Sequence, residues 1–252
     1  MSRTPPVGAT WPLFATAASQ FYNGHLARPR KLFAAFVPVQ KGSGRPAGPR
    51  ELYWPTTIAL AIAALEAGLE DVLFAAHGVR QGDEGNPITN NVNCVDGNPH
   101  KWLVADRLMA PGSQKIERVL FADFGVVLGA LPQSARFAPI SKPWSKGGYS
   151  RGTAIAGPTT WSGLRAYLDA MNHIRNATAH GDATKLGQSP TACKGTLWLL
   201  QQSGAWSVQL PHALTALRAT LSVFNVVVTA LASRLNIAMP QLTVPNTIDY
   251  PA

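Results

Sequence analysis

Residues 175–182 gather the side chains of this chain that are best suited to chemistry. They read Arg-Asn-Ala-Thr-Ala-His-Gly-Asp, with four residues between Arg175 and His180. An imidazole can move a proton near neutral pH, and the planar fork of a guanidinium can match the charge of a crowded phosphate. Cleavage of RNA by its own 2′-hydroxyl needs a group that moves a proton and a cation that matches the charge of the phosphorane. Arg175, Asn176 and His180 are therefore the candidate catalytic residues, with Asn176 orienting the imidazole or the ribose.

A helix that ends at this segment is expected to position the candidate residues. It is predicted to begin at Thr159 or Thr160, where a hydroxyl can cap the first free amides, and to stop at Gly181. Its apolar face has spacings of three and four residues and consists of Trp161, Leu164, Leu168 and Met171. Arg175 continues this face, and a buried cation requires a partner.

The other side of the same predicted helix is polar and consists of Asp169, His173, Asn176 and His180. We include His173 among the residues that support the site. On an ideal helix His180 lies about 140° around the axis from Arg175. The two residues can therefore share one site only if the helix ends between them or a second subunit completes the site.

A second long helix, predicted from Pro55 to about Arg80, is the candidate source of a partner for Arg175. Its apolar face is formed by Ile58, Ile62, Leu65, Leu69 and Val72. Glu66 and Glu70 lie one turn apart on another face. Acids on such a helix more often face water, but Glu70 or Asp71 would be able to pair with Arg175 and hold its guanidinium in place.

The segment from Arg175 to His180 resembles the motif of the HEPN superfamily, a group of helical domains of which many are ribonucleases. The superfamily is marked by an Arg, four to six residues and a His, and Asn176 matches the polar residue that often follows the Arg. The resemblance implies an all-α, HEPN-like helical bundle and RNA products with a 2′,3′-cyclic phosphate and a 5′-hydroxyl. It also implies a homodimer in which the motif helices face each other.

The charge balance favours a polyanionic partner. Lys and Arg number 22 against 13 Asp and Glu, which gives a net charge of +9. Before the motif helix, cations that can meet phosphates alternate with aromatic residues that can stack on bases, and the expected RNA-binding residues are Arg136, Lys142, Trp144, Lys146 and Arg151. A surface loop held by prolines explains the same residues equally well. Residues 28–50 form a second basic region.

The remaining sequence predicts further helices and one β-hairpin. The helices are expected at Ala15–Phe36, broken or bent near Pro29, at Pro99–Met109, at Gln114–Leu131 and at His212–Asn236, the last buried on more than one side. The hairpin is expected to join Thr196–Leu200 to Trp206–Leu210. Residues 1–252 are thus interpreted as one helical domain with long insertions near 81–98, 132–158 and 188–210.

No cofactor, structural zinc or membrane span is expected. Cys94 and Cys193 have no second Cys or His at zinc-ligand spacing, and no stretch reaches eighteen uninterrupted apolar residues. The first fourteen residues lack a signal-peptide core, which favours a cytoplasmic protein. The chain also lacks a phosphate-binding loop and a nucleophile elbow.

The main expectation is a metal-independent endoribonuclease, and two alternatives from other classes stay open. One is a non-catalytic helical adaptor or nucleotide-binding protein in which Arg175 forms a structural ion pair. The other is a metal-dependent hydrolase that uses Asp169, His173 and His180, which share a helical face at ligand-like spacing. A ribonuclease of this kind would suit a toxin or an antiviral defence effector, with a regulatory or antitoxin protein as a possible partner.

Overall fold

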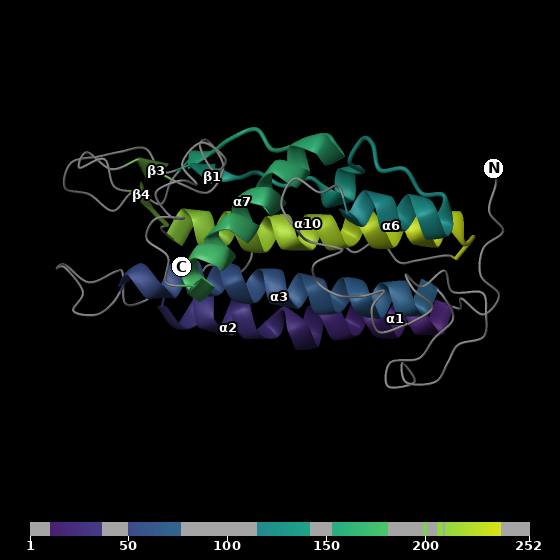
Figure 1. Cartoon of the computed structure of the whole chain (residues 1–252), viewed down its shortest axis with the longest axis horizontal. Helices are drawn as coiled ribbons and strands as arrows, with labels where there is room; N and C mark the ends of the chain where they lie inside the picture. Colours follow the sequence, from purple (N-terminus) through teal and green to yellow (C-terminus); the bar gives the residue numbers. More distant parts are fainter. Residues whose placement is uncertain are drawn as a thin grey trace.

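The computed structural model describes residues 11–36, 50–76, 115–141, 153–180, 199–200, 206–208 and 210–237. These residues are mostly helical, which confirms the predicted all-α class at that level. Two long helices, α3 (Arg50–Ala76) and α10 (Leu210–Arg234), lie side by side at the centre (Figure 1). The shorter helices α1 (Trp11–Gln20) and α2 (Ala27–Phe36) pack along α3, and α6 (Lys115–Phe124) packs along α10. The helix α7 (Trp161–His180) runs obliquely across α10 and α3.

The predicted first helix is interrupted before Pro29. A π-helical turn, η1 (Phe21–His25), separates α1 from α2, and the Leu26 amide closes it by donating to the Phe21 carbonyl at 2.9 Å. Pro29 lies in the first turn of α2, where the missing amide hydrogen breaks no helical bond. The predicted interruption of this helix therefore lies N-terminal to Pro29, and it is the π-turn at Phe21–His25 and not the proline.

The helix α10 is the most deeply buried element. It begins two residues before the predicted start, and buried residues occur on every side of it between Ala213 and Val228. By length and composition, residues 211–234 are the one candidate membrane span found in the described residues, but 89% of the apolar window is buried inside the protein. A core helix passes the same test, so this composition is weak evidence for a membrane.

The predicted helix Gln114–Leu131 is wrong in its second half. The helix α6 ends at Phe124, because Gly125 adopts a left-handed φ of 67° and donates its amide to the Phe121 carbonyl at 3.0 Å. A segment without α-helix, which contains the short 3-10 helix η4 (Gln133–Ala135), then runs over α10, where the Ser222 hydroxyl donates to the Ala135 carbonyl. Further contacts join this segment to α10, namely Arg218 to the Ala138 carbonyl and the Ile140 amide to the Thr215 hydroxyl.

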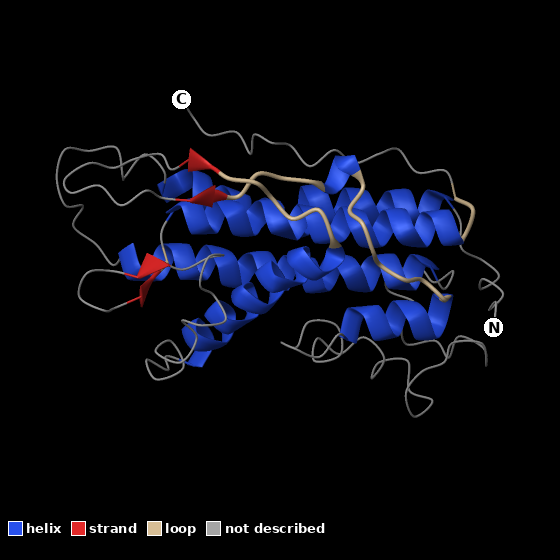
Figure 2. Ribbon diagram, turned by 90° about the horizontal axis from the view of Figure 1, so that it is seen from above, coloured by secondary structure: helices blue, strands red, loops and turns tan. Residues whose placement is uncertain are grey.

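Two short antiparallel ladders lie near the same end of the helices (Figure 2). In one, β1 (Ile140–Ser141) pairs with β2 (Thr153–Ala154), which adds order to the predicted loop at 132–158. In the other, β3 (Leu199–Leu200) pairs with β4 (Trp206–Ser207), within the two runs predicted to form the hairpin. Residues 201–205 lie outside the described part, so the complete hairpin stays a prediction. The predicted helix Pro99–Met109 and the insertion near 81–98 also lie outside the described residues.

Candidate functional site

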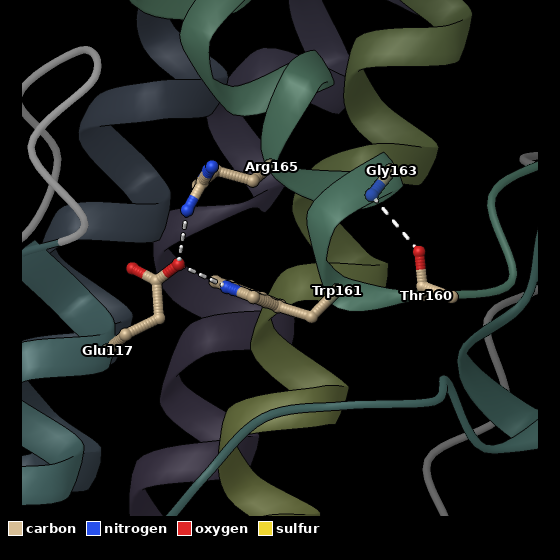
Figure 3. A network of polar contacts seen from close by, with 5 residues as sticks. All are labelled: Glu117, Thr160, Trp161, Gly163 and Arg165. Atoms are coloured by element: carbon tan, nitrogen blue, oxygen red, sulfur yellow. Dashed lines mark hydrogen bonds and ion pairs between the residues drawn. The ribbon is translucent and has the colours of Figure 1, made fainter.

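The start of α7 is fixed by its cap and by α6 (Figure 3). The Thr160 hydroxyl accepts a hydrogen bond from the Gly163 amide at 3.3 Å, which confirms the predicted cap. One oxygen of Glu117 accepts from the Trp161 indole at 2.6 Å and from Arg165 at 3.0 Å. Because both donors belong to the first turns of α7, this carboxylate anchors the beginning of the helix that carries the motif.

The predicted apolar face of α7 is confirmed, and Arg175 continues it. The four apolar residues of that face, Trp161, Leu164, Leu168 and Met171, are all buried. The Arg175 side chain is 27% exposed, and its NH1 forms an ion pair with Oε1 of Glu66 on α3, which is 14% exposed. The Arg175 Nε donates to Oδ1 of Asn176 at 3.3 Å. The guanidinium is therefore held on two sides, by an acid from another helix and by its own neighbour.

The acid that pairs with Arg175 is Glu66, so the prediction of Glu70 or Asp71 is wrong. The helix predicted to supply the acid was right, since Glu66, Glu70 and Asp71 all belong to α3. The end of α7 meets α3 one turn before Glu70, and Asp71 points toward a different element, where it pairs with His25. His173, also named as a supporting residue, is partly buried on α7 and is not among the partners that Arg175 has in the described chain.

His25 is a residue of this region that the sequence patterns did not single out. It is the last residue of η1, and its Nε2 lies 2.9 Å from Oδ2 of Asp71. The two side chains are 25% and 10% exposed. π-helical turns alter the direction of the side chains that follow them and often occur at functional sites. No motif surrounds His25, so only the tertiary contact identifies it.

Glu70 lies on α3 between the two acids that form these ion pairs, four residues after Glu66 and directly before Asp71. Burial, together with the smaller effects of the negative charges of Glu66 and Asp71, raises its pKa to about 7. Within the described part of the chain, no hydrogen bond or ion pair involves its carboxyl group. A carboxyl group with this pKa exists in both charge states near neutral pH, as a proton-transfer group requires.

His180 is the last residue of α7, and the helix is continuous from Arg175 to His180. The possibility that the helix breaks between these residues is therefore wrong. On a continuous helix the two positions are about 140° apart around the axis. The His180 side chain and Gly181 lie outside the described residues. Asn176 contacts Arg175, so its described contact differs from the predicted one with the imidazole or the ribose.

The predicted RNA-binding loop is described only in part. Arg136 is exposed, and its Nε donates to the Leu131 carbonyl at 3.2 Å. The other four predicted residues, Lys142, Trp144, Lys146 and Arg151, lie outside the described residues. In the second basic region, Arg28 and Lys31 are exposed on α2, and Arg30 lies over the Tyr22 ring at 4.9 Å. Because most of the predicted RNA-binding residues lie outside the described part of the chain, the path of an RNA strand over this protein stays a prediction.

Among the described residues, no group of three or more His, Cys, Asp and Glu side chains is placed to hold a metal ion. The alternative set of Asp169, His173 and His180 includes one side chain, that of His180, which the structure does not describe. This finding therefore does not test the metal-dependent alternative.

In comparisons with known proteins, no family model, curated protein or solved structure matched this chain. A function for the site must therefore be argued from its own contacts.

Proposed function

We propose that this chain is a metal-independent endoribonuclease with a HEPN-like helical bundle. The observation that supports it is the arrangement of Arg175, whose guanidinium is partly exposed and held by Glu66 and Asn176 at the end of α7. Donors that are fixed before the reaction stabilise developing charge without further reorganisation. The net charge of +9 also favours an anionic substrate.

The ion pair with Glu66 leaves Arg175 able to bind a phosphate. A guanidinium has five N–H donors, and the described contacts with Glu66 and Asn176 use two of them, through NH1 and Nε. The remaining donors can bind two oxygens of the scissile phosphate. The 2′-hydroxyl of the RNA then attacks phosphorus, and His180 moves a proton near neutral pH. The products are a 2′,3′-cyclic phosphate and a 5′-hydroxyl.

We expect Arg175→Ala and His180→Ala each to reduce RNA cleavage by a factor of about 100 or more while the protein stays folded. Purified protein is incubated with total RNA, with and without a chelator, and the product ends are identified. Arg165→Ala is the matched control, because Arg165 lies on the same helix but pairs with Glu117, and it should keep cleavage near wild type. Near wild-type activity of either motif variant contradicts the assignment, and loss of activity with the chelator favours the metal-dependent alternative.

A second candidate function is a non-catalytic helical protein, and the ion pair between Arg175 and Glu66 is the observation that favours it. A structural role alone would explain a cation on an apolar face, because its ion pair joins two helices. In that case RNA stays intact with wild-type protein, and Arg175→Ala lowers the melting temperature without changing any activity. The RNA assay together with a thermal melt separates this candidate from the ribonuclease. In either case we place the protein in the cytoplasm.

A further inference from the structure

The positions of three acids on α3 define a region between two neighbouring elements. Glu66 and Glu70 are four residues apart, so they lie about 40° apart around the helix and one turn apart along it. Asp71 lies about 100° further round from Glu70. Glu70 is therefore the middle acid of the three, with the α7 contact on one side and the η1 contact on the other.

Each outer acid has a basic partner, and the middle acid has none in the described chain. Glu66 pairs with Arg175, and Asp71 pairs with His25. Glu70 is only partly buried, and no hydrogen bond or ion pair with a described residue uses its carboxyl group. Its oxygens therefore have no competing described partner, while the oxygens of the outer acids are engaged.

No described contact joins a charged residue of α1, α2 or α10 to the carboxyl group of Glu70. The helix α1 carries no charged residue. Among the basic residues of α2, Arg28 and Lys31 are exposed and Arg30 lies over Tyr22. On α10, Arg218 and Arg234 donate to the carbonyls of Ala138 and Phe124. Arg175 and His25 form described contacts with the acids on either side of Glu70.

Because α7 is continuous, the proposed reaction needs a proton acceptor beside Arg175 that is not His180 of the same chain. It separates Arg175 from His180 by about 140°, so a phosphate bound at Arg175 faces away from the His180 position of the same chain. A group that takes the 2′-hydroxyl proton beside Arg175 must come from another element. The helix α3 already contacts the guanidinium through Glu66, and Glu70 follows one turn later.

We propose that Glu70 is a catalytic residue of this site and that its carboxylate accepts the proton of the attacking 2′-hydroxyl while Arg175 of the same chain holds the phosphate. This inference rests on the proposed ribonuclease function. As the proton passes to Glu70, the 2′-oxygen forms a bond to phosphorus. The bond from phosphorus to the 5′-oxygen breaks, and the leaving oxygen keeps the electron pair and takes a proton from protonated His180 of a second copy of the chain. Glu70 and His180 then return to their starting states by exchanging a proton with solvent.

The assignment gives the neighbouring residues separate roles. Glu66 and Asn176 are positioning residues, because they hold the guanidinium. Asp71 and His25 are positioning residues for the other side of Glu70, since their ion pair keeps the Asp71 carboxylate engaged with His25. The raised pKa of Glu70, to about 7, agrees with a base that is partly ionised at neutral pH.

The test is the pH dependence of single-turnover RNA cleavage between about pH 5 and pH 9. Wild-type protein should gain rate about tenfold per pH unit below pH 7, as Glu70 ionises. Glu70→Gln should cleave about 100-fold more slowly or worse and should lose this rise. Glu117→Gln is the matched control, a partly buried acid that anchors α7 through Trp161 and Arg165, and it should keep the wild-type profile.

Glu70→Gln is expected to fold, because a carboxyl group with a pKa of about 7 is already half neutral at pH 7, and Gln keeps the neutral form. Circular dichroism checks the fold. If the Gln variant does not fold, Glu70→Asp decides, because it keeps a carboxyl group that is withdrawn by one methylene. It should be at least about tenfold slower with the acidic rise retained. A wild-type rate for that variant at every pH overturns the inference.

The two proposals fail in different ways. If wild-type protein cleaves RNA and folded Glu70→Gln keeps both the rate and the acidic rise, the role of Glu70 is wrong and the ribonuclease proposal stands. If wild-type protein leaves RNA intact throughout the pH range, both proposals are overturned.

Discussion

At the scale of single residues, three acids on one helix differ because their surroundings differ. Glu66 pairs with a guanidinium, Asp71 pairs with an imidazole, and Glu70 lies between these pairs without a described ionic partner. The same functional group thus serves to hold a cation at one position and titrates near pH 7 at another. The difference arises from α7 and η1, since Arg175 of α7 pairs with Glu66 and His25 of η1 pairs with Asp71.

The raised pKa of Glu70 predicts how stability depends on pH. Its pKa in the folded protein is about 7 against an ordinary value of 4.5, so folding favours the neutral form. The stabilising contribution is fully present below about pH 4.5 and is lost as pH rises through 7. Glu70→Gln keeps a neutral group, so its melting temperature relative to wild type should increase from pH 4.5 to 7 and then level off.

Thermal melts of both proteins at several pH values measure this difference. The comparison cancels the contributions of the ionisable groups that the two proteins share. A constant difference over the whole range would mean that Glu70 ionises as freely in the folded protein as in the unfolded chain.

The sequence allowed part of this site to be anticipated. A cation in line with Leu168 and Met171 requires an acid, and the long helix at 50–76 was the correct source. The identity of that acid was not predictable, because the point where α7 crosses α3 depends on packing between distant segments. The role of His25 was not predictable either, because its direction depends on a π-turn that the apolar pattern does not reveal.

At the scale of elements, capping residues and glycines predicted the helix ends better than the spacing of apolar residues did. The cap at Thr160 was predicted correctly because its hydroxyl reaches the Gly163 amide. The end of α6 was missed because apolar residues continue at helical spacing to Leu131, whereas Gly125 stops the helix with a positive φ. Leu131 is buried all the same, in a segment without α-helix that runs over α10. Burial alone therefore does not distinguish a helix from a segment held by hydrogen bonds from a neighbouring helix.

The contact between α3 and η1 predicts a position that tolerates only glycine. A Cβ atom at Gly68 would lie 2.3 Å from Cδ2 of Phe21, whose ring stacks on Phe224 with centroids 3.8 Å apart. The ring is 1% exposed and therefore has little room to withdraw. Gly68→Ala should lower the free energy of unfolding by about 1–3 kcal/mol, as measured by chemical denaturation.

Gly24→Ala in η1 is the matched control, because its Cβ would meet its nearest neighbour, Cγ of Gln20, at an ordinary 3.8 Å. This variant should be as stable as wild type or slightly more stable, since glycine is the weaker helix former. Equal stability of the two variants would show that α3 and η1 approach less closely than described. Gly68 lies between Glu66 and Glu70, so the same close approach brings His25 to Asp71.

At the scale of the whole molecule, the continuity of α7 determines how the proposed site can be completed. The helix holds Arg175 against α3 and ends at His180, on another side of its axis. A break in the helix would have allowed one chain to direct both residues to one phosphate, and no break is present between them. Two motif helices facing each other across a two-fold axis would bring Arg175 of one chain and His180 of the other to one RNA strand. We therefore predict that the active unit is a homodimer.

Mixing two inactive variants tests this prediction. Arg175→Ala and His180→Ala chains that exchange subunits in equal amounts form mixed dimers in half of the cases, and each mixed dimer contains one intact composite site. About a quarter of the wild-type cleavage should return. The control mixture replaces the His180→Ala chain with a chain carrying both substitutions and should stay inactive, because it contains no Arg175. Sedimentation at micromolar concentration should show a dimer, whereas a fully active monomer, or the absence of recovery after proven exchange, contradicts the composite site.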